Sequence, residues 1–399
     1  MSAALRIDAL RVYRLAVPMR LRFEHAAAAR ATADPIVVRL DALPPFGELS
    51  GYGEALARAY VTGETADTVA DDVLQHFAPR LLELRAGGFA EALEFAESLP
   101  TFVDGRLVNA ARCAVELALL DLAGKAFGRR LADASGWLDM KGFEPPGALA
   151  AARYSGIVVG RSRAKLSALL RAQRCYGLRD FKLKVAVDGW QERLSWAAFE
   201  LGGAIARRRA TLRVDANGGW TPFEAAAAIP ILKQCGVESL EQPVPRAADA
   251  CHVELMAAGS PDIIADESLL TVEDAERLIE ADGVRVLNVR LAKNGGLLPS
   301  LRIAARAMAA GVDVQLGCLV GETSILTAAG LAFLELCPRA RYVEGAFGRF
   351  LLRADVLRPP LTFGYGGRLA PRRAPGLGIR VDQGAIERLS ITPGVVVRF

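Results

Sequence analysis

The sequence is short of several residue types, and each shortage excludes a class of protein. The 399 residues include only 3 histidines, and aromatic residues make up 7% of the chain. The side-chain platforms on which nucleic-acid bases stack are therefore scarce. The net charge of +4 at pH 7 is also too small, and too evenly spread, to attract nucleic acid or a membrane surface. We expect neither kind of partner.

Paired cysteines and long apolar runs are also missing. The 6 cysteines are scattered, and no two have the CxxC spacing of a redox or metal motif. In a chain of this size, scattered cysteines are typical of reduced residues in the core. The opening MSAALRIDALRVYRLAVPMR has no apolar run long enough for a signal peptide or a membrane span. We therefore expect a cytoplasmic protein.

The composition is that of a folded protein with more than one domain. Hydrophobic residues make up 52% and charged residues 24%, which excludes intrinsic disorder. At about 150 residues per domain, the length indicates two or three domains.

The first third of the chain changes from strand-like to helical patterns. Period-two alternation predicts strands at residues 5–17, 35–40 and 49–54, and three-to-four spacing predicts helices at 65–84, 89–99 and 109–127. The segment LRFEHAAAARATAD has no clean period, and we expect a loop there. Strands followed by helices indicate a separate α+β domain, which we place at residues 1–130.

From about residue 150 the pattern becomes a series of βα units. Six units are legible, with a strand-like YSGIVV before them and RYVEGA after them. Such units form a parallel sheet, and this number favours a closed barrel, over residues 131–369. Residues 370–399 end in the strand-like VVVRF, which we expect to pack back on the first domain.

Charged residues stand at the ends of several of these strands, although the interior of a parallel barrel is normally apolar. They are Lys182 and Lys184, Asp215, Glu241, Asp266 and Lys293. From Lys184 onward the intervals are 31, 26, 25 and 27 residues, each about one βα repeat. Five side chains should therefore lie at one level of the catalytic face of the barrel.

The chemistry of this row indicates a metal-assisted site. A single strand-end carboxylate is more often a helix cap than a metal ligand. Five charged strand ends in consecutive repeats, however, would require five independent coincidences if they had no common function. Three carboxylates without a nearby histidine or cysteine suit Mg²⁺, with Mn²⁺ as the alternative, and disfavour zinc. Such an ion holds a substrate carboxylate and stabilises the enolate. A lysine beside it should have a lowered pKa and serve as a base.

At these residues the sequence resembles the enolase superfamily, specifically its muconate-lactonizing-enzyme subgroup. The matching motifs are Lys182-Leu-Lys184, Asp215-Ala-Asn217, Glu241-Gln-Pro, Asp266-Glu267-Ser268 and Lys293-Asn-Gly-Gly. The resemblance covers nearly the whole chain. It implies a modified (β/α)₇β TIM-like barrel, an N-terminal α+β capping domain completed by the C-terminal tail, and a homo-oligomer.

The resemblance also implies a role for each residue of the row. The magnesium ligands would be Asp215, Glu241 and Asp266, and the acid/base groups would be Lys184 and Lys293. Lys182 would neutralise the substrate carboxylate. Asn217 and Glu267 would support the metal ligands. The related mandelate racemase subgroup uses a His–Asp pair on late strands. Here the histidines stand at positions 25, 76 and 252, so that mechanism is excluded.

Two further residues are candidates for substrate binding. At the seventh strand the subgroup has a Gly-x-Met-Leu-Glu stretch, whereas this chain has Gly317-Cys-Leu-Val-Gly-Glu322, one residue longer. Glu322 is the first candidate. His25 is the second, because capping loops of the family reach over the barrel, although a solvated loop histidine is an equal alternative. On the sixth strand, Asn288 and Arg290 share a face, and either would point inward.

These residues together predict an enzyme that removes the proton next to a substrate carboxylate with the help of Mg²⁺. The outcome we favour is isomerisation of a small carboxylate, by a cycloisomerase or by a racemase or epimerase of acylamino acids or dipeptides, because 1,1-proton transfer needs a base on each face. A lyase, such as a dehydratase or an o-succinylbenzoate-synthase-like enzyme, is the alternative. A catalytically silent binding protein on the same fold is the second alternative.

Overall fold

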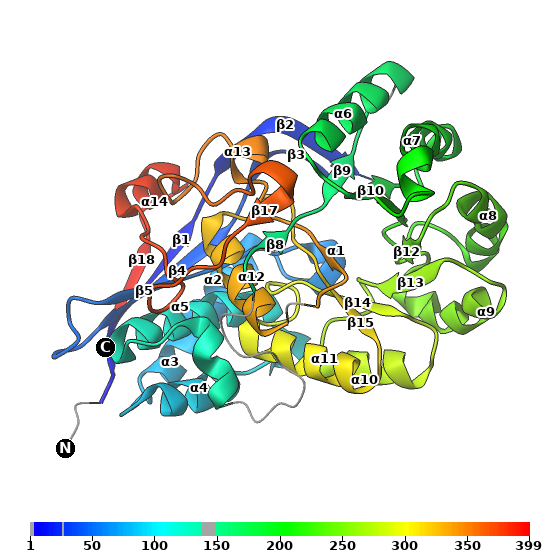
Figure 1. Cartoon of the computed structure of the whole chain (residues 1–399). Coiled ribbons are helices and arrows are strands. Elements are labelled where there is room, and N and C mark those ends of the chain that lie inside the picture. The colour runs from blue at the N-terminus through cyan, green and yellow to red at the C-terminus, as the bar shows by residue number, and fades with distance from the viewer. Residues whose placement is uncertain (1–3, 26–27, 138–148, 161, 338) are drawn as a thin grey trace.

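The computed structural model of the chain describes residues 4–25, 28–137, 149–160, 162–337 and 339–399, with the backbone alone between residues 21 and 30. It has two parts, an N-terminal sheet with its helices and a ring of parallel strands surrounded by helices (Figure 1). No helix in these ranges is long and apolar enough to cross a membrane.

The N-terminal sheet is antiparallel and contains both ends of the chain. Its order is β18-β1-β4-β5, formed by β1 (Ile7–Arg14), β4 (Ile36–Ala42), β5 (Ser50–Ala55) and β18 (Val395–Arg398). In Figure 1 the red β18 lies beside the blue β1, and Ala9 pairs with Arg398. The C-terminal tail therefore completes the first domain, as the sequence predicts.

The expected loop after the first strand is a β-hairpin, so that prediction was wrong. β2 (Val17–His25) pairs antiparallel with β3 (Ala28–Ala33), and the strand expected over residues 5–17 ends as β1 at Arg14. The alanine-rich segment has no alternation of apolar and polar residues to reveal a strand. Its backbone pairing comes from the partner strand instead, and a pattern of side chains does not report on that pairing.

The predicted helices of the first domain are confirmed. α2 (Ala66–Asp72), a π-helical turn (Val73–Phe77) and α3 (Ala78–Leu81) follow one another, after a short α1 (Ala59–Thr62) and before α4 (Phe89–Glu97) and α5 (Asn109–Phe127). α5 is the core of this domain, because its residues from Asn109 to Gly124 are all buried. It lies directly on β5, where a Cβ atom on Gly51 or Gly53 would come within 2.1 and 2.0 Å of carbonyl oxygens of α5.

The second part is the parallel barrel that the βα pattern predicts. Its strands, in sheet order, are β9 (Gly156–Val158), β10 (Asp180–Lys184), β11 (Thr211–Asp215), β12 (Ser239–Glu241), β13 (Asp262–Ala265), β14 (Val286–Val289), β15 (Asp313–Leu316) and β16 (Tyr342–Val343). A hydrogen bond of 2.8 Å from Ser155 N to Val343 O joins the two edges.

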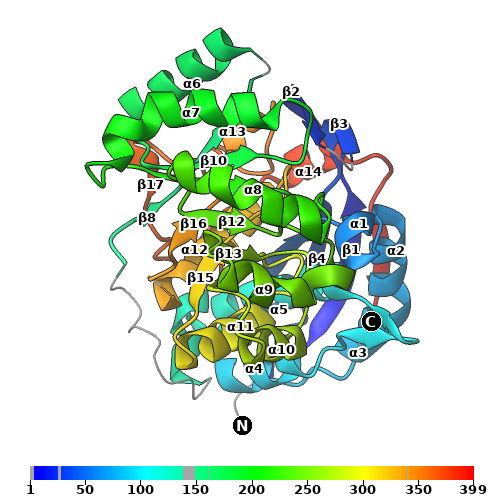
Figure 2. The same cartoon turned by 90° about the vertical axis from the view of Figure 1, so that its right-hand side faces the viewer.

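Helices alternate with these strands and cover the outside of the barrel. They are α6 (Arg163–Cys175), α7 (Trp190–Ile205), α8 (Pro222–Gln234), α9 (His252–Ala257), α10 (Val272–Glu280), α11 (Leu297–Ala309) and α12 (Ser324–Leu336). Figure 2 shows α7, α8 and α9 on the outer face of the strands. The remaining elements are β6 (Phe102–Val103), β7 (Arg106–Leu107), β8 (Ala152–Arg153), β17 (Arg368–Leu369), α13 (Gly348–Leu351) and α14 (Gln383–Leu389). We propose the domain boundaries that the sequence predicts, namely residues 1–130 for the first domain, 131–369 for the barrel and 370–399 for the C-terminal segment.

Buried carboxylates of the first domain cap helices of the barrel. Glu54 on β5 accepts hydrogen bonds from Thr323 N at 2.7 Å and Leu326 N at 3.0 Å, at the start of α12. Glu116 on α5 accepts from Leu297 N and Leu298 N, at the start of α11. Burial raises the pKa of each carboxyl to about 7. The free N–H groups and the helix dipole at these helix ends stabilise a carboxylate there, so these contacts fix the two domains together.

The contact between α5 and β5 depends on glycine at position 53. Gly53→Ala should lower the free energy of unfolding by about 3 kcal/mol, because the new methyl group collides with backbone atoms that have no room to move. Urea denaturation measures this. The control is Gly202→Ala in α7, where a Cβ meets nothing within 4 Å and stability should be equal or slightly higher. Equal stability of the two variants would contradict the close packing.

Candidate active site

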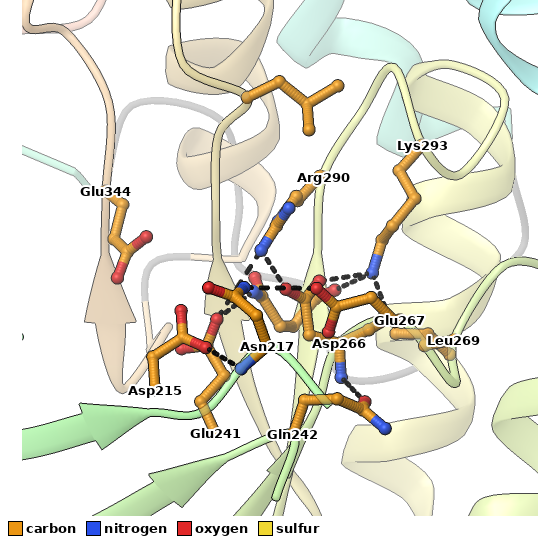
Figure 3. Close-up of polar contacts among 12 residues, drawn as sticks. Asp215, Asn217, Glu241, Gln242, Asp266, Glu267, Leu269, Arg290, Lys293 and Glu344 are labelled. Atoms are coloured by element: carbon orange, nitrogen blue, oxygen red, sulfur yellow. Dashed lines mark hydrogen bonds and ion pairs between the residues drawn. The ribbon is translucent and has the colours of Figure 1, made fainter. Parts of the chain in front are cut away.

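The charged strand ends lie together at the carboxyl ends of the barrel strands. The register pairs Lys184 with Asp215 across β10 and β11, and Asp215 with Glu241 across β11 and β12. Asp266 follows directly after β13. The side chains of Asp215, Glu241 and Asp266 have no exposed surface. Figure 3 shows the three carboxylates as neighbours, each supplied by a different strand.

The two lysines of β10 lie on the same face of that strand, as period two predicts, and both contact the row. Lys184 Nζ lies 2.6 Å from Asp215 Oδ2 and 2.6 Å from Asn217 Oδ1. Lys182 Nζ lies 3.1 Å from Glu241 and 3.2 Å from Asp215. Burial opposes ionisation of Asp215, but the two lysines outweigh it and hold its pKa well below the usual range.

Lys293 occupies the other end of the row. Its Nζ donates to Asp266 Oδ1 at 2.9 Å, to the Asp266 carbonyl at 2.7 Å and to the Asn288 carbonyl at 2.9 Å. The side chain is fully buried. Burial, and after it the neighbouring Arg290 guanidinium, lowers the pKa of Lys293 well below that of an ordinary lysine.

The turn that carries Lys293 is held by α5 of the first domain. Asn109 Nδ2 donates to the Lys293 carbonyl at 2.7 Å. The glycines that follow allow this approach: Gly295 faces Asn109, and a Cβ on Gly296 would lie 2.0 Å from Glu116 Oε2. Both glycines also have a positive φ, which disfavours other residues. The Lys-Asn-Gly-Gly motif is therefore a docking point between the two domains.

Asn217 and Glu267 lie beside the carboxylate row and contact one another. Asn217 N donates to Asp215 Oδ1 at 2.9 Å, and its side-chain amide donates to Glu267 Oε1 at 3.2 Å. Burial, and after it the charge of Asp215, raises the pKa of Glu267. Gln242, which sequence reasoning did not single out, accepts hydrogen bonds from the backbone N–H groups of Asp266 and Ser268 and so fixes the turn that carries Glu267.

Glu241 is surrounded by donors from later strands. Asn288 Nδ2 and Gln315 Nε2 donate to its two carboxylate oxygens at 3.0 and 3.1 Å. Asn288 therefore does point inward, and so does Arg290, whose guanidinium contacts Asp266 and lies 3.6 Å from Glu241. The sequence left the direction of these two residues open, and the structure places both at the row.

The sequence patterns did not predict a buried group of charges inside the barrel, formed around Glu344. Glu344, directly after β16, contacts Lys182 Nζ at 2.8 Å and also pairs with Arg213 of β11. Arg213 is fully buried, with its guanidinium 4.4 Å from the centre of the Tyr342 ring. The signal was available, because Glu344 stands two βα repeats beyond Lys293, at the same kind of strand end as the other carboxylates.

Comparison with known proteins identifies the family. A domain profile described as "Enolase C-terminal domain-like" matches residues 165–385, and one described as "Mandelate racemase / muconate lactonizing enzyme, N-terminal domain" matches residues 9–136. The chain belongs to the enolase superfamily, in its muconate-lactonizing-enzyme-like subgroup. The two matches fall on the two parts of the structure.

Relatives of this enolase-superfamily chain are isomerases. The L-Lys-D/L-Arg epimerase of Methylococcus capsulatus is 32% identical over 83% of this chain and 87% of that protein. The L-Ala-D/L-Glu epimerase of Bacillus subtilis is 27% identical over 94% of this chain and 97% of that protein. Muconate cycloisomerase 1 of Pseudomonas putida is 29% identical over 86% of this chain and 87% of that protein.

A solved structure agrees with these relatives. The muconate lactonizing enzyme of Pseudomonas fluorescens, in complex with muconolactone, has a TM-score of 0.82 at 26% identity. The match covers 98% of this chain and 100% of that one. The chain is therefore an isomerase of the muconate cycloisomerase and racemase type, and enzymes of this superfamily are generally dependent on a divalent metal.

Within the described ranges, no group of three or more histidine, cysteine or acidic side chains has the spacing that holds a metal ion directly. Each carboxylate of the row contacts a lysine or arginine nitrogen instead.

Of the two candidates for substrate contacts, Glu322 lines a cavity together with Gly317 and Glu344. Glu322, on the loop after β15, accepts a hydrogen bond from Leu319 N at 2.6 Å. Burial, and after it the carboxylate of Glu54, raises the pKa of Glu322 to about 8. His25 is the last residue of β2, and its side chain falls outside the described part of the hairpin.

The Glu344 ion pair should make stability fall in acid. Burial opposes ionisation of Glu344, but Lys182 and Arg213 outweigh it and lower the pKa from 4.5 to about 2. This stabilisation is present above pH 4.5 and is lost as the pH falls toward 2. Glu344→Gln should lower the free energy of unfolding at pH 7 by about 3 kcal/mol, because two buried cations lose a partner. Guanidinium denaturation at pH 7 and at pH 3 measures this, and a deficit that stays the same at both would contradict the ionic role.

Proposed function

We propose that this enzyme transfers a proton at the carbon next to a substrate carboxylate, with Lys184 and Lys293 as the two acid/base groups. The observation that carries the proposal is the position of the two amines at opposite ends of one carboxylate row. Lys184 Nζ contacts Asp215 at one end, and Lys293 Nζ contacts Asp266 at the other. A substrate carbon placed between them would have a base on each face.

We propose further that Asp215, Glu241 and Asp266 hold Mg²⁺, with Mn²⁺ as the alternative. The donor set is all oxygen, which suits a hard cation. Three further oxygens, Glu267 Oε2, Asn288 Oδ1 and Gln315 Oε1, are buried without a hydrogen-bond partner. When bound, the ion would hold the substrate carboxylate and stabilise the negative charge that develops as the proton leaves.

Each of the three lysines has a role that follows from its surroundings. The lowered pKa of Lys293 favours its neutral amine, which is the form that accepts a proton from carbon. Asp215 and Asn217 hold Lys184 at the other end of the row, from which it would serve the opposite face. Burial opposes a charge on Lys182, but Glu241, Glu344 and Asp215 together raise its pKa. Lys182 therefore stays charged and would neutralise the substrate carboxylate.

The reaction that uses both lysines is 1,1-proton transfer, so we propose epimerisation or racemisation of a dipeptide or an acylated amino acid. The names of the relatives support this choice, since several are dipeptide or amino-acid epimerases. Cycloisomerisation of an unsaturated dicarboxylate is the second candidate, supported by the relatives named muconate cycloisomerase.

Isotope exchange separates the two lysines. In D₂O with Mg²⁺, the wild type should exchange the α-proton of a substrate in a panel of L,L- and L,D-dipeptides and N-succinyl amino acids, followed by proton NMR. Lys184→Ala and Lys293→Ala should each slow epimerisation about 1,000-fold, and each should still exchange the α-proton of one epimer, because the other base remains. Lys165→Ala, an exposed residue of α6, is the control that should change nothing.

Two results would contradict this assignment. One is epimerisation at the wild-type rate in either active-site variant. The other is loss of exchange from the same epimer in both variants, which would show that the two lysines serve one face. Lactone formation from cis,cis-muconate without exchange in the panel would favour the second candidate.

We also propose that the enzyme works in the cytoplasm as a homo-oligomer. All six cysteines are free thiols, which supports a reducing compartment. Phe199 on α7 and Phe223 on α8 are 72% and 83% exposed, which is unusual for phenylalanine and supports a contact between copies. Light scattering should therefore give a multiple of 42.6 kDa, and Phe199→Glu with Phe223→Glu should lower it. A single-chain mass for the wild type would contradict the oligomer.

A further inference from the structure

Arg290 lies among the carboxylates to which the proposed function assigns the metal. Its side chain is 7% exposed and comes from the end of β14. The guanidinium Nη2 contacts Asp266 Oδ2 and lies 3.6 Å from Glu241 Oε1 (Figure 3). One guanidinium therefore bridges two of the three proposed metal ligands, which come from neighbouring strands.

The surroundings of Arg290 do not satisfy a guanidinium as a permanent structural group. Its Nε is buried without a hydrogen-bond partner. Arg112, which is also buried, uses Nε and both terminal nitrogens with four different carbonyl and carboxylate partners. Glu267 Oε2, Asn288 Oδ1 and Gln315 Oε1 are also buried without a hydrogen-bond partner, so the guanidinium does not bond to any of them.

A divalent ion that binds the oxygens of Glu241 and Asp266 needs the space that this guanidinium occupies. Gly317 borders the side chain of Arg290. Its Cγ would lie 3.0 Å from a Cβ on Gly317, so the absence of a side chain there leaves room for the arginine stem beside the loop after β15. That loop carries Glu322, and no cation among the described residues forms an ion pair with Glu322.

We propose that Arg290 is a built-in counter-ion that bridges Glu241 and Asp266 in the metal-free enzyme, gives way when the divalent ion binds, and then pairs with Glu322. The inference rests on the metal ligands of the proposed function. It makes Arg290 a positioning residue, which prevents two buried carboxylates from repelling each other before the ion arrives. It also gives Glu322 a role in receiving the displaced arginine.

Calorimetric titration with Mn²⁺ and with Mg²⁺ tests the displacement directly. Arg290→Met should bind the ion about tenfold more tightly than the wild type, because the ion no longer displaces an internal cation. Without metal the variant should melt at a lower temperature than the wild type, and with saturating Mg²⁺ this deficit should disappear. Circular dichroism checks the fold, and Arg290→Gln, which is also neutral, serves if the methionine variant does not fold.

The matched control is Arg341→Met. Arg341 bridges Asp262 at 2.7 Å and Glu238 at 3.0 Å, which stand at the opposite ends of the same two strands, β13 and β12. The charge change is therefore identical, and the distance from the proposed ligands is one strand length. Metal affinity of this variant should equal that of the wild type.

A double-mutant cycle tests the second position of the arginine. Glu322→Gln should weaken metal binding several-fold in the wild type, because the displaced guanidinium loses its acceptor, and should have no effect in the Arg290→Met background. Equal weakening in both backgrounds would overturn the pairing of Arg290 with Glu322.

The outcomes separate this inference from the proposed function. Metal binding of equal strength in the wild type and Arg290→Met would overturn the displacement while leaving the three metal ligands in place. Weaker binding in Arg290→Met would also overturn it, and would show that the arginine orients the ligands. If the wild type binds neither ion, the metal assignment itself fails and the inference fails with it.

Discussion

The structure depends on compensation of charge among carboxylates buried at one end of the barrel. Asp215, Glu241 and Asp266 have no exposed surface, and a buried carboxylate without a partner costs several kcal/mol. Cations are therefore required, and the chain supplies them on each side, with the two lysines of β10 at one end and Arg290 at the other. The amines of Lys184 and Lys293 lie at the two ends of the same row, and the proton transfer that we propose uses this arrangement.

The first domain contributes to this site through the backbone as well as by covering it. Glu54 and Glu116 cap the helices α12 and α11, and Asn109 holds the turn that carries Lys293. A change at the surface between the two domains would therefore move Lys293, to which we assign acid/base chemistry. The long buried helix α5, which lies against β5 through Gly51 and Gly53, is the element that transmits this connection.

Much of this was predictable because catalytic side chains in a parallel barrel follow its repeat. The spacing of Lys184, Asp215, Glu241, Asp266 and Lys293 placed them at one end of the strands, and α5 has the bounds that its periodicity predicts. The β2–β3 hairpin was not predictable, because backbone pairing holds it together and its alanines carry no pattern. Arg213 and Glu344 were missed for a different reason. An arginine inside a strand is typically expected to face solvent. Only the folded barrel shows that Arg213 and Glu344 neutralise each other.

The central claim is that the three strand-end carboxylates bind one divalent ion between two lysines. Anomalous diffraction at the manganese edge, from crystals grown with Mn²⁺ and a carboxylate ligand, tests it most directly. The account predicts one peak about 2.1 Å from oxygens of Asp215, Glu241 and Asp266, with Lys184 and Lys293 on opposite sides of the ligand. A peak elsewhere on the chain, no peak among these carboxylates, or both lysines on one side of the ligand would contradict it.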